Sequence, residues 1–120
     1  MSKPIEDYGA AERRRFERVK IAYSKQVLVL DEKGAKVGYL RQLGRGGFLM
    51  QPESVFPRDS KIHKLVIHEP QEDLKVLVQA RVRYADPRGT GFEFVSLDTD
   101  TAIEVGIIIG KYYESQSTQL

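Results

Sequence analysis

Arginines near the beginning of the chain carry the most evident chemistry in this sequence. Residues 12–20 hold five basic residues against two acids, a local charge of +3. Arg14 and Arg18 are four residues apart, so they share one face whether this segment is helical or extended. A guanidinium group is a planar fork that binds phosphate, or the O6/N7 edge of guanine, through paired hydrogen bonds. The pair therefore suits a guanine nucleotide, and the alternative is a solvated basic segment without a ligand.

A second candidate is the glycine-rich stretch Gln42-Leu43-Gly44-Arg45-Gly46-Gly47. Glycines let a backbone come close to an anion or a flat ring and present its N–H groups. The stretch lacks the Lys-Ser/Thr ending of a P-loop and does not open a helix, which argues against a triphosphate site. Taken alone, it is also explained by a tight hairpin that binds nothing.

Other site chemistries find little support. The chain has no cysteine, which excludes disulfides, thiolate catalysis and sulfur-ligated zinc. The two histidines, His63 and His68, have opposite parity on a strand and so point to opposite faces, where they cannot easily share a metal. No G-x-S-x-G nucleophile motif occurs. We therefore predict a protein that is not an enzyme and has neither a metal site nor a cofactor.

The elements that must position these residues are mainly strands. The chain has 120 residues, 41% of them hydrophobic and 30% charged, which predicts one ordinary globular domain. Residues 74–84 alternate between an apolar face that includes Tyr84 and a polar face, as in a half-buried strand. Because short turns and no helix-length pattern separate the strands, they predict a small closed antiparallel barrel. The six predicted strands lie near residues 19–29, 37–43, 48–51, 62–68, 74–84 and 91–96.

The last element is predicted to be a helix that packs on the barrel. Thr101-x-x-Glu104 fits a capping box, which places the start of the helix near residues 98–101. Ile103 and Ile107 lie off the apolar stripe and are either further core or a small self-association surface. The stripe itself has helical spacing and consists of Ala102, Val105, Ile108, Ile109 and Tyr112.

The two ends of the chain are expected to be flexible tails, residues 1–11 and 115–120. No apolar run approaches the roughly 20 residues that a membrane span requires. The first residues have no apolar segment of the secretory type. We therefore expect a cytoplasmic protein without a membrane span.

The order of these features resembles the PilZ domain family. The resemblance covers residues 12–114: the arginine segment, a strand hairpin, the glycine-rich turn, the sequence Gly-Thr-Gly-Phe-Glu-Phe at 89–94, and a closing helix. It implies a mainly all-β fold, a six-stranded antiparallel barrel with a C-terminal α-helix. The family motif is R-x-x-x-R followed by D/N-x-S-x-x-G, and Arg14 and Arg18 take the two arginine positions. Many members are bacterial receptors for cyclic di-GMP, which is the ligand that the resemblance implies.

The second half of the motif departs from the family. Gln42 stands where the family has Asp or Asn beside a guanine edge, Gly44 stands where it has Ser, and Gly47 matches the last glycine. Gln42 keeps an amide on a longer side chain, whereas Gly44 has lost the hydroxyl. Losing two polar contacts corresponds to binding that is about tenfold to a few hundredfold weaker. The auxiliary basic residues of the predicted site are Arg13, Arg15 and Arg45.

The leading hypothesis is a non-catalytic cyclic di-GMP receptor that acts on an effector protein in bacterial signalling, in the control of motility, biofilm or exopolysaccharide. Its nucleotide would lie near residues 42–47, under the arginine segment. One alternative is a degenerate PilZ domain that binds a protein and no nucleotide. A nucleic-acid-binding barrel is disfavoured because no obvious row of exposed aromatic residues is present. We expect a monomer or a weak homodimer.

Overall fold

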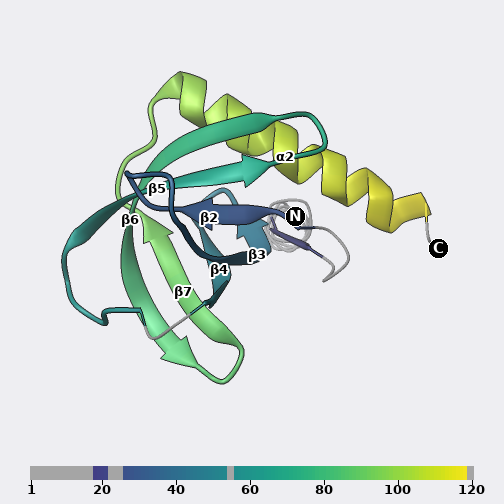
Figure 1. Cartoon of the computed structure of the whole chain (residues 1–120). Helices are drawn as coiled ribbons and strands as arrows, with labels where there is room; N and C mark the ends of the chain where they lie inside the picture. The colour runs from purple at the N-terminus through teal and green to yellow at the C-terminus, as the bar shows by residue number, and fades with distance from the viewer. Residues whose placement is uncertain (1–17, 22–25, 54–55, 119–120) are drawn as a thin grey trace, which may run out of the picture.

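The computed structural model describes residues 18–21, 26–53 and 56–118. In this part of the chain, antiparallel strands form one closed barrel with a single helix beside it (Figure 1). The elements are β1 (Arg18–Lys20), β2 (Leu28–Leu30), β3 (Lys36–Gly44), β4 (Gly47–Pro52), β5 (Ile62–Glu69), β6 (Leu74–Asp86), β7 (Gly89–Phe94) and α2 (Thr99–Thr118).

Six of the strands close the barrel. Each is paired with the next in the ring β3-β2-β5-β6-β7-β4, and β4 pairs with β3 again to complete it. The seventh strand, β1, pairs with the end of β3, while β2 pairs with its beginning. Since β4 occupies the opposite edge of β3, β1 and β2 follow one another along the same edge. The predicted six-stranded antiparallel barrel is confirmed. Within the described residues, the strand expected over residues 19–29 corresponds to β1 and β2.

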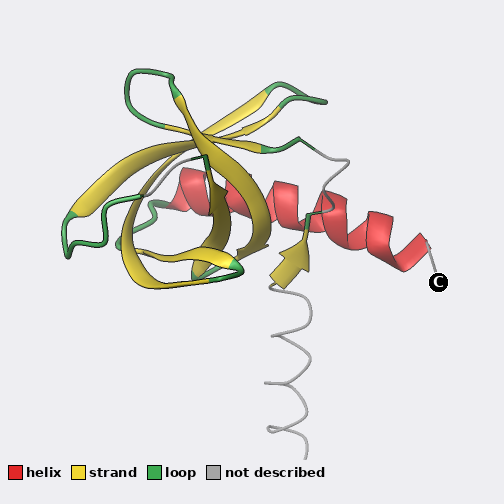
Figure 2. Ribbon diagram, turned by 60° about the horizontal axis from the view of Figure 1, so that its bottom comes forward, coloured by secondary structure: helices red, strands yellow, loops and turns green. Residues whose placement is uncertain are grey.

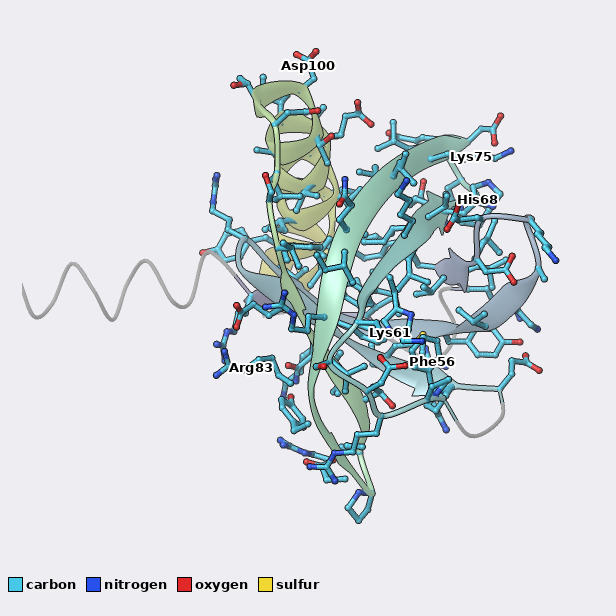
Figure 3. The ribbon with its side chains drawn as sticks, turned by 90° about the vertical axis from the view of Figure 1, so that its left-hand side faces the viewer. Phe56, Lys61, His68, Lys75, Arg83 and Asp100 are labelled. Atoms are coloured by element: carbon cyan, nitrogen blue, oxygen red, sulfur yellow. The ribbon has the colours of Figure 1, made fainter. Side chains whose placement is uncertain are left out.

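The alternation predicted for residues 74–84 sets the core face of β6. Val76, Val78 and Ala80 are buried, and intervening residues such as Lys75 project outward (Figure 3). Tyr84 does not follow this pattern, because the register with β7 shifts between Val82 and Tyr84. Such a bulge reorients the side chains that follow it. The prediction that Tyr84 faces the core is therefore wrong, and the residue is 39% exposed.

Helix α2 begins at Thr99, within the range predicted for its start, but its capping residue differs from the one that the capping box predicts. The N–H of Thr101 donates to Oδ1 of Asp98 at 2.8 Å, so Asp98, and not Thr101, caps the helix. This hydrogen bond also lowers the pKa of the Asp98 carboxyl. The helix continues to Thr118, beyond the expected domain end at 114, so most of the tail predicted over 115–120 is helical.

The apolar stripe of α2 packs against the barrel, which the helix crosses on one side (Figure 2). Ile103 and Ile107 face away from the barrel and are 56% and 50% exposed. Of the two alternatives for this pair, further core is therefore wrong, and self-association stays a prediction. The buried residues of the stripe are Val105, Ile108, Ile109 and Tyr112.

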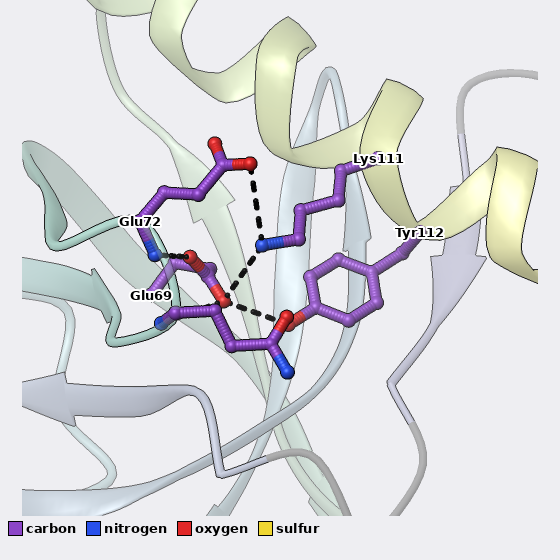
Figure 4. A network of polar contacts seen from close by, with 5 residues as sticks. Glu69, Glu72, Lys111 and Tyr112 are labelled. Carbon is purple, nitrogen blue, oxygen red and sulfur yellow. Dashed lines mark hydrogen bonds and ion pairs between the residues drawn. The ribbon is translucent and has the colours of Figure 1, made fainter.

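A polar contact also joins the helix to the barrel (Figure 4). Glu69, the last residue of β5, is only 1% exposed. Its carboxylate accepts hydrogen bonds from the N–H groups of Gln71 at 3.2 Å and Glu72 at 2.8 Å, in the turn that follows. From α2, the hydroxyl of Tyr112 donates to it at 3.2 Å, and the ammonium group of Lys111 lies 3.2 Å away. We call these five residues the Glu69 network.

Candidate functional site

A cleft of about 510 Å³ lies over the turn between β3 and β4. The turn, the short strand β1 and the neighbouring strands β6 and β7 supply its walls. Residues far apart in the sequence therefore meet in one place. The lining residues are Arg18, Gln42, Leu43, Gly44, Arg45, Gly46, Gly47, Phe48, Leu49, Arg83, Tyr84, Gly91, Phe92 and Glu93.

The pairing of β1 with β3 brings the arginine motif to the glycine-rich turn. Arg18 lies directly opposite Gly44, and Val19 lies opposite Leu43. Val19 and Leu43 are buried in the core, so by strand alternation Arg18 points outward. Gly44 has no side chain, so nothing from this position competes with the guanidinium group for space above the turn.

Backbone contacts hold the turn against β7. The N–H of Phe94 donates to the carbonyl of Gly46 at 2.9 Å. A Cβ atom on Gly47 would lie 1.9 Å from the carbonyl oxygen of Phe92, which is far inside van der Waals contact. Beneath the turn the rings of Phe48 and Phe92 stack with centroids 4.7 Å apart. Gly47 is therefore needed for close packing of β4 on β7, whatever the cleft binds.

Among the described residues, the charged groups of the cleft come from four different segments. Arg18, Arg45 and Arg83 supply three guanidinium groups, and Glu93 supplies a carboxylate. Arg83 on β6 forms an ion pair with Glu93 on β7, and their side chains are 63% and 45% exposed. Arg83 projects outward at the margin of the barrel (Figure 3). With three guanidinium groups against one carboxylate, such a surface attracts anions.

Tyr84 lines the cleft together with two other aromatic residues of the described chain, Phe48 and Phe92. A Cβ atom on Gly91 would lie 2.3 Å from the Tyr84 ring, so the ring lies directly over this glycine of β7. The guanidinium carbon of Arg88 is 5.9 Å from the ring centroid. The ring therefore covers β7 at Gly91. Tyr84 itself stays partly exposed to solvent.

Five of the predicted site residues line this cleft: Arg18, Gln42, Gly44, Arg45 and Gly47. Arg13, Arg14 and Arg15 lie outside the described residues. The sequence interpretation did not assign Arg83, Tyr84 or Glu93 to the site. The polar face of the strand at 74–84 included Arg83, but only the closure of the barrel shows that this face borders the turn.

The histidines have separate carboxylate partners. His63 Nε2 lies 3.0 Å from Oδ1 of Asp59, and this contact lowers the pKa of Asp59. His68 Nε2 lies 3.2 Å from Oδ1 of Asp73. Within the described part of the chain, no three His, Cys, Asp or Glu residues gather where a metal ion could bind. The same part contains no helix that is long and apolar enough to cross a membrane.

The PilZ domain family matches residues 12–109 of the sequence. The chain belongs to the PilZ domain family. PilZ domains are generally non-catalytic binding domains, and the family is one of cyclic di-GMP receptors. The matched range includes both halves of the binding motif and every strand of the barrel. No curated protein has significant sequence similarity to this chain.

Solved structures share the fold of this PilZ domain at low sequence identity. An uncharacterized Legionella protein has 9% identity and a TM-score of 0.59, over 83% of this chain and 97% of that one. The PilZ domain of CeSA from a cellulose-synthesizing bacterium has 18% identity and a TM-score of 0.57, over 78% and 95%. The Bacillus subtilis inhibitor of motility MotI/DgrA has 15% identity and a TM-score of 0.56, over 79% and 48%. These likenesses confirm the barrel with its C-terminal helix.

Proposed function

We propose that this PilZ domain binds cyclic di-GMP in the cleft over the β3–β4 turn and acts as a non-catalytic receptor. The observation that carries the proposal is the pairing of Arg18 with Gly44. It joins the second arginine of R-x-x-x-R to the second half of the motif, in a cleft that also contains Gln42 and Gly47. In this proposal Arg14 supplies the other guanidinium group of the motif.

The chemistry of the cleft supports a dianionic nucleotide. Cyclic di-GMP has two phosphates, and guanidinium groups bind phosphate oxygens through charge-assisted hydrogen bonds. Arg45 adds a cation at the tip of the turn, and the amide of Gln42, in the same cleft, can both donate and accept. These contacts offset part of the affinity lost with the Asp/Asn and Ser of the motif.

The bound nucleotide then changes the surface that an effector protein meets. A ligand can shift the equilibrium between two states of a protein only as far as the difference between its affinities for those states allows. The similar solved structures include an inhibitor of motility and a PilZ domain from a cellulose-synthesizing bacterium. They support a role in the control of motility or exopolysaccharide.

Calorimetric titration with cyclic di-GMP tests the proposal. We expect saturable binding by the unmodified chain, weakened by about tenfold to a hundredfold in Arg18→Ala, because two charge-assisted hydrogen bonds are lost. Arg58→Ala is the matched control, since Arg58 is exposed and outside the cleft. Absence of heat at millimolar nucleotide would show that the receptor assignment is wrong.

The second candidate is an adaptor that binds a protein and no nucleotide, and the departures at Gln42 and Gly44 favour it. The variant Gln42→Asp with Gly44→Ser restores the family motif. Gly44 is not among the described glycines with positive φ, so a serine is compatible with its backbone. Binding by the restored chain alone would establish the adaptor, whereas binding by both chains would exclude it.

A further inference from the structure

Glu93 is an unexpected residue in a cleft that is suited to anions. Among the described residues that line the cleft, it is the only acid. A carboxylate beside a bound phosphate weakens binding by like-charge repulsion unless it serves another part of the ligand. The position and the partners of Glu93 indicate what that part is.

The strand register places Glu93 beside the end of the motif turn. Its Cα partner on β4 is Gly47, the last residue of the motif. Phe92 and Phe94 on either side of it are buried, so Glu93 points outward from β7. The hydrogen bond from Phe94 to Gly46 fixes this part of β7 against the turn. A carboxylate is thus present next to a turn whose own sequence has lost its acid at Gln42.

Arg83 holds this carboxylate and balances its charge. The ion pair joins Nη1 of Arg83 to Oε2 of Glu93. A carboxylate offers about four lone-pair sites on its two oxygens, so one contact leaves acceptor capacity for a ligand. Both side chains are about half exposed or more, so they remain accessible from the cleft.

We propose that Glu93, positioned by Arg83, reads the guanine edge of the nucleotide. Guanine presents two adjacent donors, N1–H and the exocyclic amino group at C2, which match the two oxygens of a carboxylate. Adenine presents a lone pair at N1 and has no amino group at C2, so a carboxylate repels it. The role that the family motif gives to Asp or Asn in the turn has in this way moved to β7. This inference rests on the proposed function and names the residue that gives it base selectivity.

Titrations with three cyclic dinucleotides test the inference. We expect the unmodified chain to bind cyclic di-GMP more tightly than cyclic di-IMP, which lacks the amino group at C2, and more tightly than cyclic di-AMP. Hydrogen bonds to a charged group are worth about tenfold to a hundredfold in affinity. In Glu93→Ala the preference for guanine over hypoxanthine should disappear, while Glu93→Gln, which keeps one acceptor, should retain part of it.

In this inference Arg83 is a positioning residue. The ratio of the affinities for cyclic di-GMP and cyclic di-AMP, the selectivity ratio, tests this role. Arg83→Ala should reduce the preference for guanine over adenine, and Arg83→Lys, which keeps the positive charge, should restore much of it. The matched control is Glu53→Ala, which breaks an exposed ion pair with Lys36 (2.6 Å) outside the cleft and should leave the ratio unchanged.

The outcomes separate the inference from the proposed function. If Arg18→Ala weakens cyclic di-GMP binding but Glu93→Ala keeps the full preference for guanine, Glu93 is not the reader and the receptor assignment stands. If the unmodified chain binds none of the three nucleotides, both are overturned. Thermal unfolding of each folded variant confirms that the comparison is made on intact barrels.

Discussion

Two carboxylates of this protein, Glu69 and Glu93, are each paired with a cation in opposite surroundings. Glu69 is 1% exposed, and every donor of the Glu69 network converges on it. The side chain of Glu93 is 45% exposed, and Arg83 is its ion-pair partner on the neighbouring strand. The first carboxylate joins the helix to the barrel, whereas the second lies at the mouth of a cleft.

The difference shows how burial assigns a role to an ion pair. Removing one partner of a buried pair leaves donors without an acceptor and is strongly destabilising. An exposed pair contributes little to the free energy of unfolding, because water screens and replaces its contacts. Glu93 can therefore accept further hydrogen bonds from a ligand, beside its contact with Arg83, at little cost to the fold.

The largest effect is expected for Glu69→Ala. This change removes the acceptor for two backbone N–H groups, for the Tyr112 hydroxyl and for Lys111. We expect the free energy of unfolding to fall by about 3 kcal/mol, as for a broken buried ion pair. Urea unfolding measures this loss.

The control for Glu69→Ala is Glu72→Ala. Glu72 is 61% exposed at its side chain and lies 3.7 Å from the same lysine. It makes a weak surface pair, so its loss should cost less than about 1 kcal/mol. Equal losses in the two variants would contradict the role of the Glu69 network.

Acid should weaken the Glu69 network and, with it, lower the free energy of unfolding. Burial of the Glu69 carboxyl raises its pKa, but hydrogen bonds from the Glu72 and Gln71 amides and from Lys111 outweigh burial and hold the pKa below its ordinary value. A lowered carboxyl pKa stabilises the fold above the unfolded value of about 4.3, and this contribution is lost as the pH falls through the folded value.

The measurement is the free energy of unfolding between pH 6 and pH 3, in the unmodified chain and in Glu69→Gln. We expect the unmodified chain to lose more stability over this range, because the amide side chain of the variant takes up no proton. The Glu72→Ala control should keep the steeper dependence. Parallel curves for the unmodified chain and Glu69→Gln would contradict this assignment.

Most of the fold could be predicted from local patterns. Alternation gave the faces of β6 up to Val82, and the spacing of Val105, Ile108, Ile109 and Tyr112 gave the buried face of α2. The predictions failed where a single backbone detail decides the outcome. The bulge before Tyr84 and the capping of α2 by Asp98 are set by hydrogen-bond geometry that residue types alone do not specify.

The site could be predicted only for the part that lies along the motif. Arg18, Gln42, Gly44 and Gly47 were expected to lie close together, and the structure brings them to one cleft. The other wall, from β6 and β7, depends on the closure of the barrel, which pairs Gly47 with Glu93 across 46 positions of sequence. No local signal links residues that are so far apart in the chain.

The smallest stability effect is expected for Arg83→Ala. The side chain of Arg83 is 63% exposed and that of Glu93 is 45% exposed, so solvent replaces the lost contact. The free energy of unfolding should change by less than about 1 kcal/mol, as for other surface ion pairs. Urea unfolding should therefore give nearly the same midpoint as for the unmodified chain. A loss as large as that of Glu69→Ala would mean that Arg83 and Glu93 hold β6 to β7, and the contrast between the two carboxylates would fail.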